Sequence, residues 1–183
     1  VMESSHIRVM RIADNMRNVA VTEGDKVEAQ IRFGWEIDAY PVNEIAEAVQ
    51  AVGKGDVDAL VEEYYSKYQI LLEGRDPEEF KKHVAVQAQI EIGFERFLEE
   101  KNYQAIVTHF GDLGALQQLP GLAIQRLMEK GYGFGGEGDW KTAAMVRLMK
   151  IMTTGKKDAK GTSFMEDYTY NLVPGKEGIL EAH

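Results

Sequence analysis

Short apolar runs alternate along the chain with longer segments in which apolar residues recur every three or four positions. The runs at 7–12, 35–42 and 103–110 are rich in β-branched or aromatic residues and predict strands. The longer segments between and after them have helical spacing and predict helices that begin near residues 26, 43, 56, 76, 121 and 139. Strands that alternate with helices in this way predict an α/β fold, with a mostly parallel sheet flanked by helices over residues 1–155.

Two segments fit more than one structure. Between 84 and 92, apolar residues alternate as in a strand, but they also fit the helix predicted for 76–101, and the Ala, Gln and Glu residues among them favour the helix. The short run at 19–21 is predicted to continue the sheet.

The pattern changes after Gly155. A polar linker at 156–161 leads into 163–173, which is rich in Phe, Tyr and Thr, and a turn at 175–178 follows. This predicts a β-hairpin and places the start of a second, truncated β domain at 156–183.

The composition narrows the class of protein. Apolar residues make up 44% and charged residues 28% of the chain, as in globular proteins, and no apolar run approaches the roughly 18 residues that a membrane helix needs. No signal segment opens the chain, so we expect a cytoplasmic protein without a membrane partner. A net charge of −9 argues against nucleic acid as a partner, and the absence of cysteine excludes disulfides and thiol catalysis.

The methionine-rich stripe of the helix that Asp139 caps is predicted to be core packing. It consists of Met145, Leu148, Met149 and Met152.

The glycine-rich segment 131–138 satisfies the pattern G-x-G-x-x-G of dinucleotide-binding loops. That fingerprint needs a strand before it, whereas 123–130 has a helical pattern, and Glu137 and Asp139 lie where a phosphate would bind. Nucleotide binding is therefore disfavoured. Glu137 is either a carboxylate that the glycines bring into a crowded site or a solvated side chain on a flexible loop.

A second candidate carboxylate is Glu166, within 163–170. In a strand it shares a face with Phe164 and Tyr168, and a carboxylate between aromatic rings is costly to bury unless a cation compensates it. The alternative is a strand edge on which Glu166 faces water. Asp14, Asp112 and His109 each follow or end a predicted strand, where α/β folds gather binding groups, although a histidine at such a position is more often structural than catalytic.

Five motifs together resemble, in the same order, segments of L-arabinose isomerases. They are IADNMR (12–17), QLPGL (118–122), GGEGDWKTA (135–143), TSFMEDYTY (162–170) and GILEAH (178–183). The resemblance covers essentially the whole chain. It implies the L-fucose/L-arabinose isomerase middle-domain type of fold, followed by the first hairpin of the family's C-terminal β domain.

The resemblance also implies chemistry. The family interconverts L-arabinose and L-ribulose, and also D-galactose and D-tagatose, through a metal-stabilised cis-enediol. Its divalent ion is usually Mn²⁺, with Co²⁺ or Mg²⁺ as alternatives. By resemblance Glu137, Glu166 and His183 are metal ligands, the two glutamates are also catalytic, and Met16 and Phe110 line the substrate. The family's second histidine ligand lies further along its chain, and its members assemble as homotetramers or homohexamers.

The match departs from the family at 109–113, where HFGDL replaces the commoner T-F-E-D-L form. With three of four ligands, we expect the 183 residues to be inactive alone. The competing hypothesis is a non-catalytic sugar-binding or assembly module of the same fold.

Overall fold

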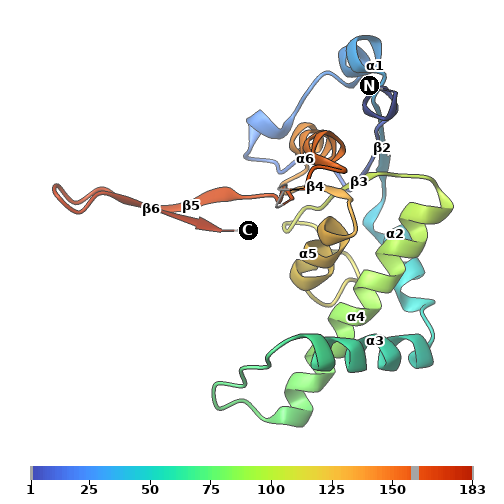
Figure 1. Ribbon diagram of the computed structural model, residues 1–183, viewed down its shortest axis with the longest axis vertical. Helices are drawn as coiled ribbons and strands as arrows, with labels where there is room; N and C mark the ends of the chain where they lie inside the picture. Colours follow the sequence, from blue (N-terminus) through green and yellow to red (C-terminus); the bar gives the residue numbers. More distant parts are fainter. Residues whose placement is uncertain (1, 158–160, 183) are drawn as a thin grey trace.

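A computed structural model describes residues 2–157 and 161–182 of the chain. Its main sheet has four parallel strands in the order β2-β1-β3-β4 (Figure 1). The strands are β1 (Arg8–Ile12), β2 (Glu36–Tyr40), β3 (Ala105–Val107) and β4 (Gly133–Gly135). Val9 of β1 is paired with both Ile37 and Ala105, so β1 and β3 form the centre of the sheet. The predicted parallel α/β fold is confirmed.

Helices connect the strands and cover both faces of the sheet. They are α1 (Lys26–Phe33), α2 (Val42–Gln50), α3 (Lys54–Lys67), α4 (Pro77–Glu100), α5 (Gly121–Glu129) and α6 (Trp140–Thr153). Short 3₁₀ turns lie at Glu3–Ser5 (η1) and Ala20–Thr22 (η2). Asp25, Asp76 and Asp139 begin α1, α4 and α6 because their carboxylates accept hydrogen bonds from backbone N–H groups of the first turn.

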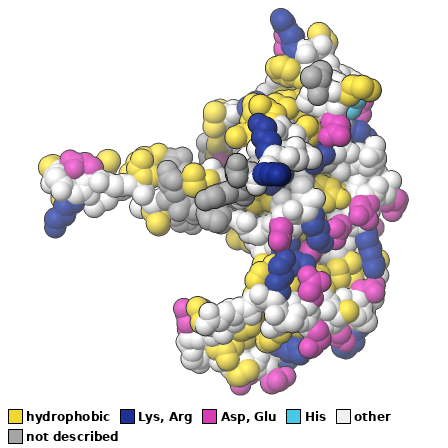
Figure 2. Space-filling model, viewed as in Figure 1, with side chains coloured by type: hydrophobic (Ala, Val, Ile, Leu, Met, Phe, Trp, Pro, Cys, Tyr) yellow, Lys and Arg dark blue, Asp and Glu magenta, His cyan; other side chains and the backbone are white. Residues whose placement is uncertain are grey.

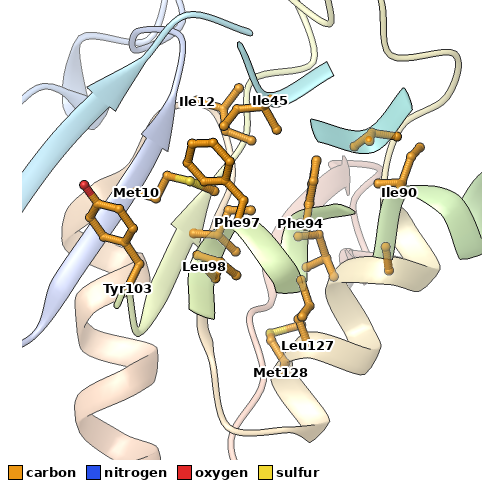
Figure 3. Close-up of a cluster of buried hydrophobic side chains, with 14 of the residues drawn as sticks. Met10, Ile12, Ile45, Ile90, Phe94, Phe97, Leu98, Tyr103, Leu127 and Met128 are labelled. Atoms are coloured by element: carbon orange, nitrogen blue, oxygen red, sulfur yellow. The ribbon is translucent and has the colours of Figure 1, made fainter. Parts of the chain in front are cut away.

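The alternation of side chains along β1 separates two hydrophobic cores. Met10 and Ile12 lie on the face covered by α2, α4 and α5, where the larger core forms around Phe94 (Figure 3). Val9 lies on the opposite face with Trp140 of α6 and Ala29 of α1. Helix α3 packs against α4 at a distance from the sheet and has a small core of its own. The domain is therefore a three-layer α/β structure with an added helix.

The predicted hairpin is confirmed as a separate two-stranded antiparallel sheet, formed by β5 (Glu166–Asn171) and β6 (Gly178–Ala182). It projects away from the helices and the main sheet (Figure 1). Leu172 and Leu180 on this arm are 78% and 60% exposed. The division into two domains at residue 155 stays a prediction.

The surface carries both signs of charge in close mixture. Figure 2 shows lysine and arginine side chains interspersed with aspartate and glutamate where α3 and α4 lie. Many of these charges pair across helices, as Lys81 does with Glu62 and Arg96 with Asp56. Among residues 2–157 and 161–182, no helix is long and apolar enough to cross a membrane.

The prediction that the methionine stripe of α6 is core packing was wrong. Met145, Met149 and Met152 are 47%, 46% and 62% exposed, and only Leu148 of the stripe packs partly against the core. The buried face of α6 instead carries small residues such as Ala143. A Cβ on Gly133 or Gly135 would collide with the backbone of α6, so helix and strand touch directly and the methionines face outward.

Two strand predictions also needed correction, and one strand was missed. Residues 19–21 do not continue the sheet, because Ala20–Thr22 forms a 3₁₀ turn. The run at 103–110 gives only the three-residue strand β3. The glycine-rich segment contains β4, which the sequence pattern did not predict because glycine has low strand propensity.

Candidate active site

The order of the strands creates a crevice at one edge of the sheet. From β1 the chain moves outward to β2, whereas from β3 it moves to β4 on the other side. Loops that leave neighbouring parallel strands in opposite directions open a crevice beyond their carboxyl ends, where α/β proteins bind ligands. The loops that begin at Ala13 and Thr108 lie at this edge.

A cavity of about 820 Å³ lies in this crevice, and we call it the edge cavity. It is lined by Asp14, Asn15, Met16, Arg17, Asn18, His109, Gly111 and Asp112. Met16, predicted to line the substrate, is the only apolar side chain among them. A lining of this composition suits a ligand that carries many hydroxyl groups.

Asp14 is held in place from beneath. Arg11 of β1, whose side chain is 6% exposed, donates from Nη2 to Asp14 Oδ1. The same oxygen accepts from the backbone N–H of Asn15 at 2.9 Å. The guanidinium Nε and Nη1 have no hydrogen-bond partner in the described part of the chain. The buried Arg11 thus orients the Asp14 carboxylate, whose own side chain is 75% exposed.

Glu137 lies between β4 and α6 and has a left-handed backbone, with φ of 56°. Its carbonyl accepts from the N–H of Met16 at 3.0 Å, and the N–H of Gly138 donates to the carbonyl of Thr108 at 3.1 Å. A Cβ on Gly138 would overlap the backbone of Asn15. The loops after β1, β3 and β4 are therefore tied together, and a non-glycine residue at positive φ within them is the kind of strain that gathers at functional sites.

Glu166 and Phe110 line a second, smaller cavity of about 280 Å³, which we call the aromatic cavity. Its walls include Phe134 and Phe164, whose rings meet edge to face with centroids 5.1 Å apart. Glu166 is half-buried at the start of β5. The structure thus places Glu166 and Phe110 on the wall of one cavity.

The two cavities adjoin through the loop that carries Glu137. Gly136 lies near Phe164 of the aromatic cavity, because a Cβ there would be 3.5 Å from its ring. The carbonyl of Glu137 accepts from the N–H of Met16, which lines the edge cavity. Thr108 lines the aromatic cavity and accepts from the residue after Glu137. All four predicted site residues that the structure describes are therefore at one edge of the sheet.

The donor set for a metal ion is incomplete within the described residues. Within residues 2–157 and 161–182, no group of three or more His, Cys, Asp or Glu side chains could hold a metal ion. His183, the third predicted ligand, lies outside the described residues. Glu137 and Glu166 supply oxygen donors of the kind that a hard divalent ion prefers, but two carboxylates alone do not make a site.

Sequence reasoning missed Arg11. A signal was present, because an arginine inside an apolar strand run must bury its charge and therefore needs a carboxylate within reach. Asp14, three residues further on, is that carboxylate.

Comparison with known proteins identifies the family. The family model described as the L-arabinose isomerase central domain matches residues 8–155. The chain belongs to the L-arabinose isomerase family. Curated L-arabinose isomerases from Geobacillus thermodenitrificans (strain NG80-2), Geobacillus stearothermophilus and Yersinia pseudotuberculosis serotype O:1b (strain IP 31758) are 54%, 53% and 52% identical to it over 181 residues. These matches cover 99% of this chain and 36% of each relative, so the chain spans about a third of the length of those isomerases.

Proposed function

We propose that the chain forms part of the active site of an aldose–ketose isomerase that interconverts L-arabinose and L-ribulose, and also D-galactose and D-tagatose. The observation that carries the proposal is the convergence of the loops after β1, β3 and β4 with the start of β5 at one sheet edge. Family members that match the chain are named L-arabinose isomerases. The polar edge cavity suits the hydroxyls of a sugar, and the aromatic cavity suits its apolar carbon face.

Glu137 and Glu166 are proposed as the acid–base residues. Isomerisation of an aldose removes a proton from the carbon next to the carbonyl and delivers a proton to the carbonyl carbon. One further proton moves from the hydroxyl oxygen to the carbonyl oxygen. A carboxylate performs such transfers when it is held within hydrogen-bond reach of the carbon that loses the proton. The hydrogen bond from the Met16 N–H to the Glu137 carbonyl anchors the backbone of Glu137 beside the edge cavity, and Glu166 lines the aromatic cavity at the start of β5.

We further propose that Glu137, Glu166 and His183 are ligands of a divalent ion, Mn²⁺ with Co²⁺ or Mg²⁺ as substitutes. When bound, such an ion would polarise the sugar oxygens and stabilise the negative charge that develops during proton transfer. Because the chain spans 36% of the length of its relatives, we expect the isolated 183 residues to show no turnover. A homotetramer or homohexamer is proposed for the active assembly.

A chimera tests the function. Residues 1–183 replace the matching segment of the Geobacillus thermodenitrificans enzyme, and ketose formation from L-arabinose is measured with Mn²⁺. Glu137→Gln and Glu166→Gln are each expected to lower kcat about a hundredfold or more, because an amide cannot accept the proton. Glu129→Gln is the matched control, since Glu129 pairs with Lys67 on the surface of α5 and should leave kcat unchanged.

The outcomes separate the hypotheses. Full activity of the chimera with Gln at either position would refute the roles of the glutamates. Turnover by the isolated chain would refute the expectation that it is inactive. Sugar binding that neither a chelator nor Glu137→Gln affects, without any turnover, would show a non-catalytic sugar-binding module instead.

A further inference from the structure

His109 is held in one orientation at the edge cavity. The backbone N–H of Gly111 donates to His109 Nδ1 at 3.0 Å. A ring nitrogen that accepts a hydrogen bond carries no proton, so this contact places the ring proton on Nε2. The fold therefore fixes the tautomer and presents an N–H donor on the ring.

This arrangement depends on glycine at position 111. A Cβ there would be 2.8 Å from His109 Cε1 and 3.3 Å from Nδ1, so a larger residue would displace the ring. The two residues by which HFGDL departs from the family form are therefore linked. Gly111 makes room for the imidazole of His109 and also donates a hydrogen bond to it.

The Nε2 donor has no hydrogen-bond partner within the described ranges 2–157 and 161–182, although His109 lines the edge cavity. The same cavity contains Asp14, an acceptor that Arg11 and a backbone N–H hold in place. A fixed donor and a fixed acceptor in one cavity match neighbouring hydroxyl groups, because each hydroxyl both donates and accepts.

The charge of the lining selects among hydroxyl-bearing ligands. Asp14 is already paired with Arg11, and the other carboxylate of the lining, Asp112, is matched in number by Arg17. A phosphorylated sugar or a sugar acid would bring a negative charge for which this lining offers no excess of positive charge. The cavity therefore favours a neutral polyol.

We propose that His109 is a specificity-determining residue, whose Nε2–H donates to one hydroxyl of an unphosphorylated sugar while Asp14 accepts from a neighbouring hydroxyl. The proposal rests on the proposed function, since it assigns the substrate of that site. A site built to hydrogen-bond a hydroxyl discriminates against the analogue that lacks it, because its polar groups are then left unpaired.

Two variants separate the donor from the anchor. In His109→Asn the side-chain oxygen can still accept from Gly111, but the donor at Nε2 is lost. In His109→Gln the amide nitrogen reaches the position of Nε2. In the chimera, kcat/KM for L-arabinose is expected to fall about tenfold in His109→Asn, mainly through KM, and to recover to within a few-fold in His109→Gln.

A panel of mono-deoxy L-arabinoses tests whether His109 contacts a hydroxyl. If His109 were merely structural, its substitution would not change the ratio of kcat/KM for L-arabinose to that for each deoxy analogue. The wild-type chimera should discriminate against one deoxy analogue about tenfold more strongly than His109→Asn does. Equal discrimination by the two proteins would overturn the proposal. The ¹⁵N signals of the His109 ring should show the Nε2–H tautomer in the wild type and lose it in Gly111→Ala, and the opposite tautomer in the wild type would also overturn it.

Binding by the 183-residue chain distinguishes failure of this proposal from failure of the proposed function. Equilibrium dialysis with labelled L-arabitol needs no turnover. Arabitol binding that weakens in His109→Asn supports the role of His109 even if the chimera does not isomerise sugar, whereas isomerisation with unchanged deoxy discrimination refutes only His109. Tighter binding of D-arabinose 5-phosphate than of L-arabitol would refute the neutral-polyol selection.

Discussion

The carboxylate of Glu91 offers the sharpest test of how the helical layer is held together. Glu91 is 0% exposed in the middle of α4. It accepts from Arg126 Nε at 2.8 and 3.0 Å, from the Tyr64 hydroxyl at 2.5 Å and from Lys130 Nζ at 3.0 Å. Arg126 also binds Glu63 at 2.6 Å. One buried acid therefore joins α3, α4 and α5.

The magnitude follows from what each substitution leaves behind. Arg126→Met leaves the carboxylate of Glu91 inside the protein with only Tyr64 and the half-exposed Lys130 as partners. Breaking a buried pair in this way costs about 3–5 kcal/mol of unfolding free energy. Glu91→Leu leaves the guanidinium with Glu63, which is 52% exposed, and should cost somewhat less. The double variant removes both charges, so no buried charge is left without its partner. Its loss of unfolding free energy should therefore be smaller than the sum of the two single losses by about 2 kcal/mol or more.

Urea unfolding of the chain, followed by circular dichroism, measures all three losses. Arg96→Met is the control, because Arg96 is also on α4 but pairs with Asp56 at the surface, where both side chains are more than half exposed. It should cost about 1 kcal/mol or less. Strictly additive losses for Arg126→Met and Glu91→Leu would refute the coupling of the two charges.

Two further predictions concern close packing and exposure. Gly138→Ala should lower the unfolding free energy by about 1–3 kcal/mol more than Gly155→Ala. Both glycines have positive φ (83° and 78°), but only a Cβ at 138 meets backbone, and equal losses in urea unfolding would contradict the close approach of the loops. Hydrogen peroxide should oxidise Met149, which is 46% exposed, well before Met10, which is 0% exposed. Peptide mass spectrometry measures both rates, and similar rates would show that the methionine face of α6 is covered in solution.

Much of the fold could be predicted from periodicity. The helix over 76–101 was correctly chosen over a strand, because alternation in a short window is weaker than helix-forming composition over a long one. The hairpin after the polar linker was also found. Strand β4 was not, since its sequence is Gly-Phe-Gly and its place in the sheet comes from tertiary contact with α6. The prediction that the methionines of α6 are buried failed for the same reason. The glycines of β4 let α6 pack against the sheet through its alanines, so the methionines face outward.

The candidate site was predictable only in part. The rule that parallel strands end at a common edge placed Asp14 and His109 together. Glu137 and Glu166 required the family resemblance, because residue type alone favoured a solvated side chain for Glu137 and did not decide for Glu166. The pairing of His109 with Gly111 depends on a loop conformation that no periodicity reports.

The two outer strands of the main sheet have a consequence for behaviour at high protein concentration. An open strand edge is a template to which another polypeptide can add, which is the first step of aggregation. Strand β2 carries Glu36 and Asp38, whose charges Arg8 of the neighbouring strand holds at 3.0 and 3.1 Å. Strand β4 spans only three residues, too few for stable addition. Both edges of the main sheet thus discourage self-association through strand addition.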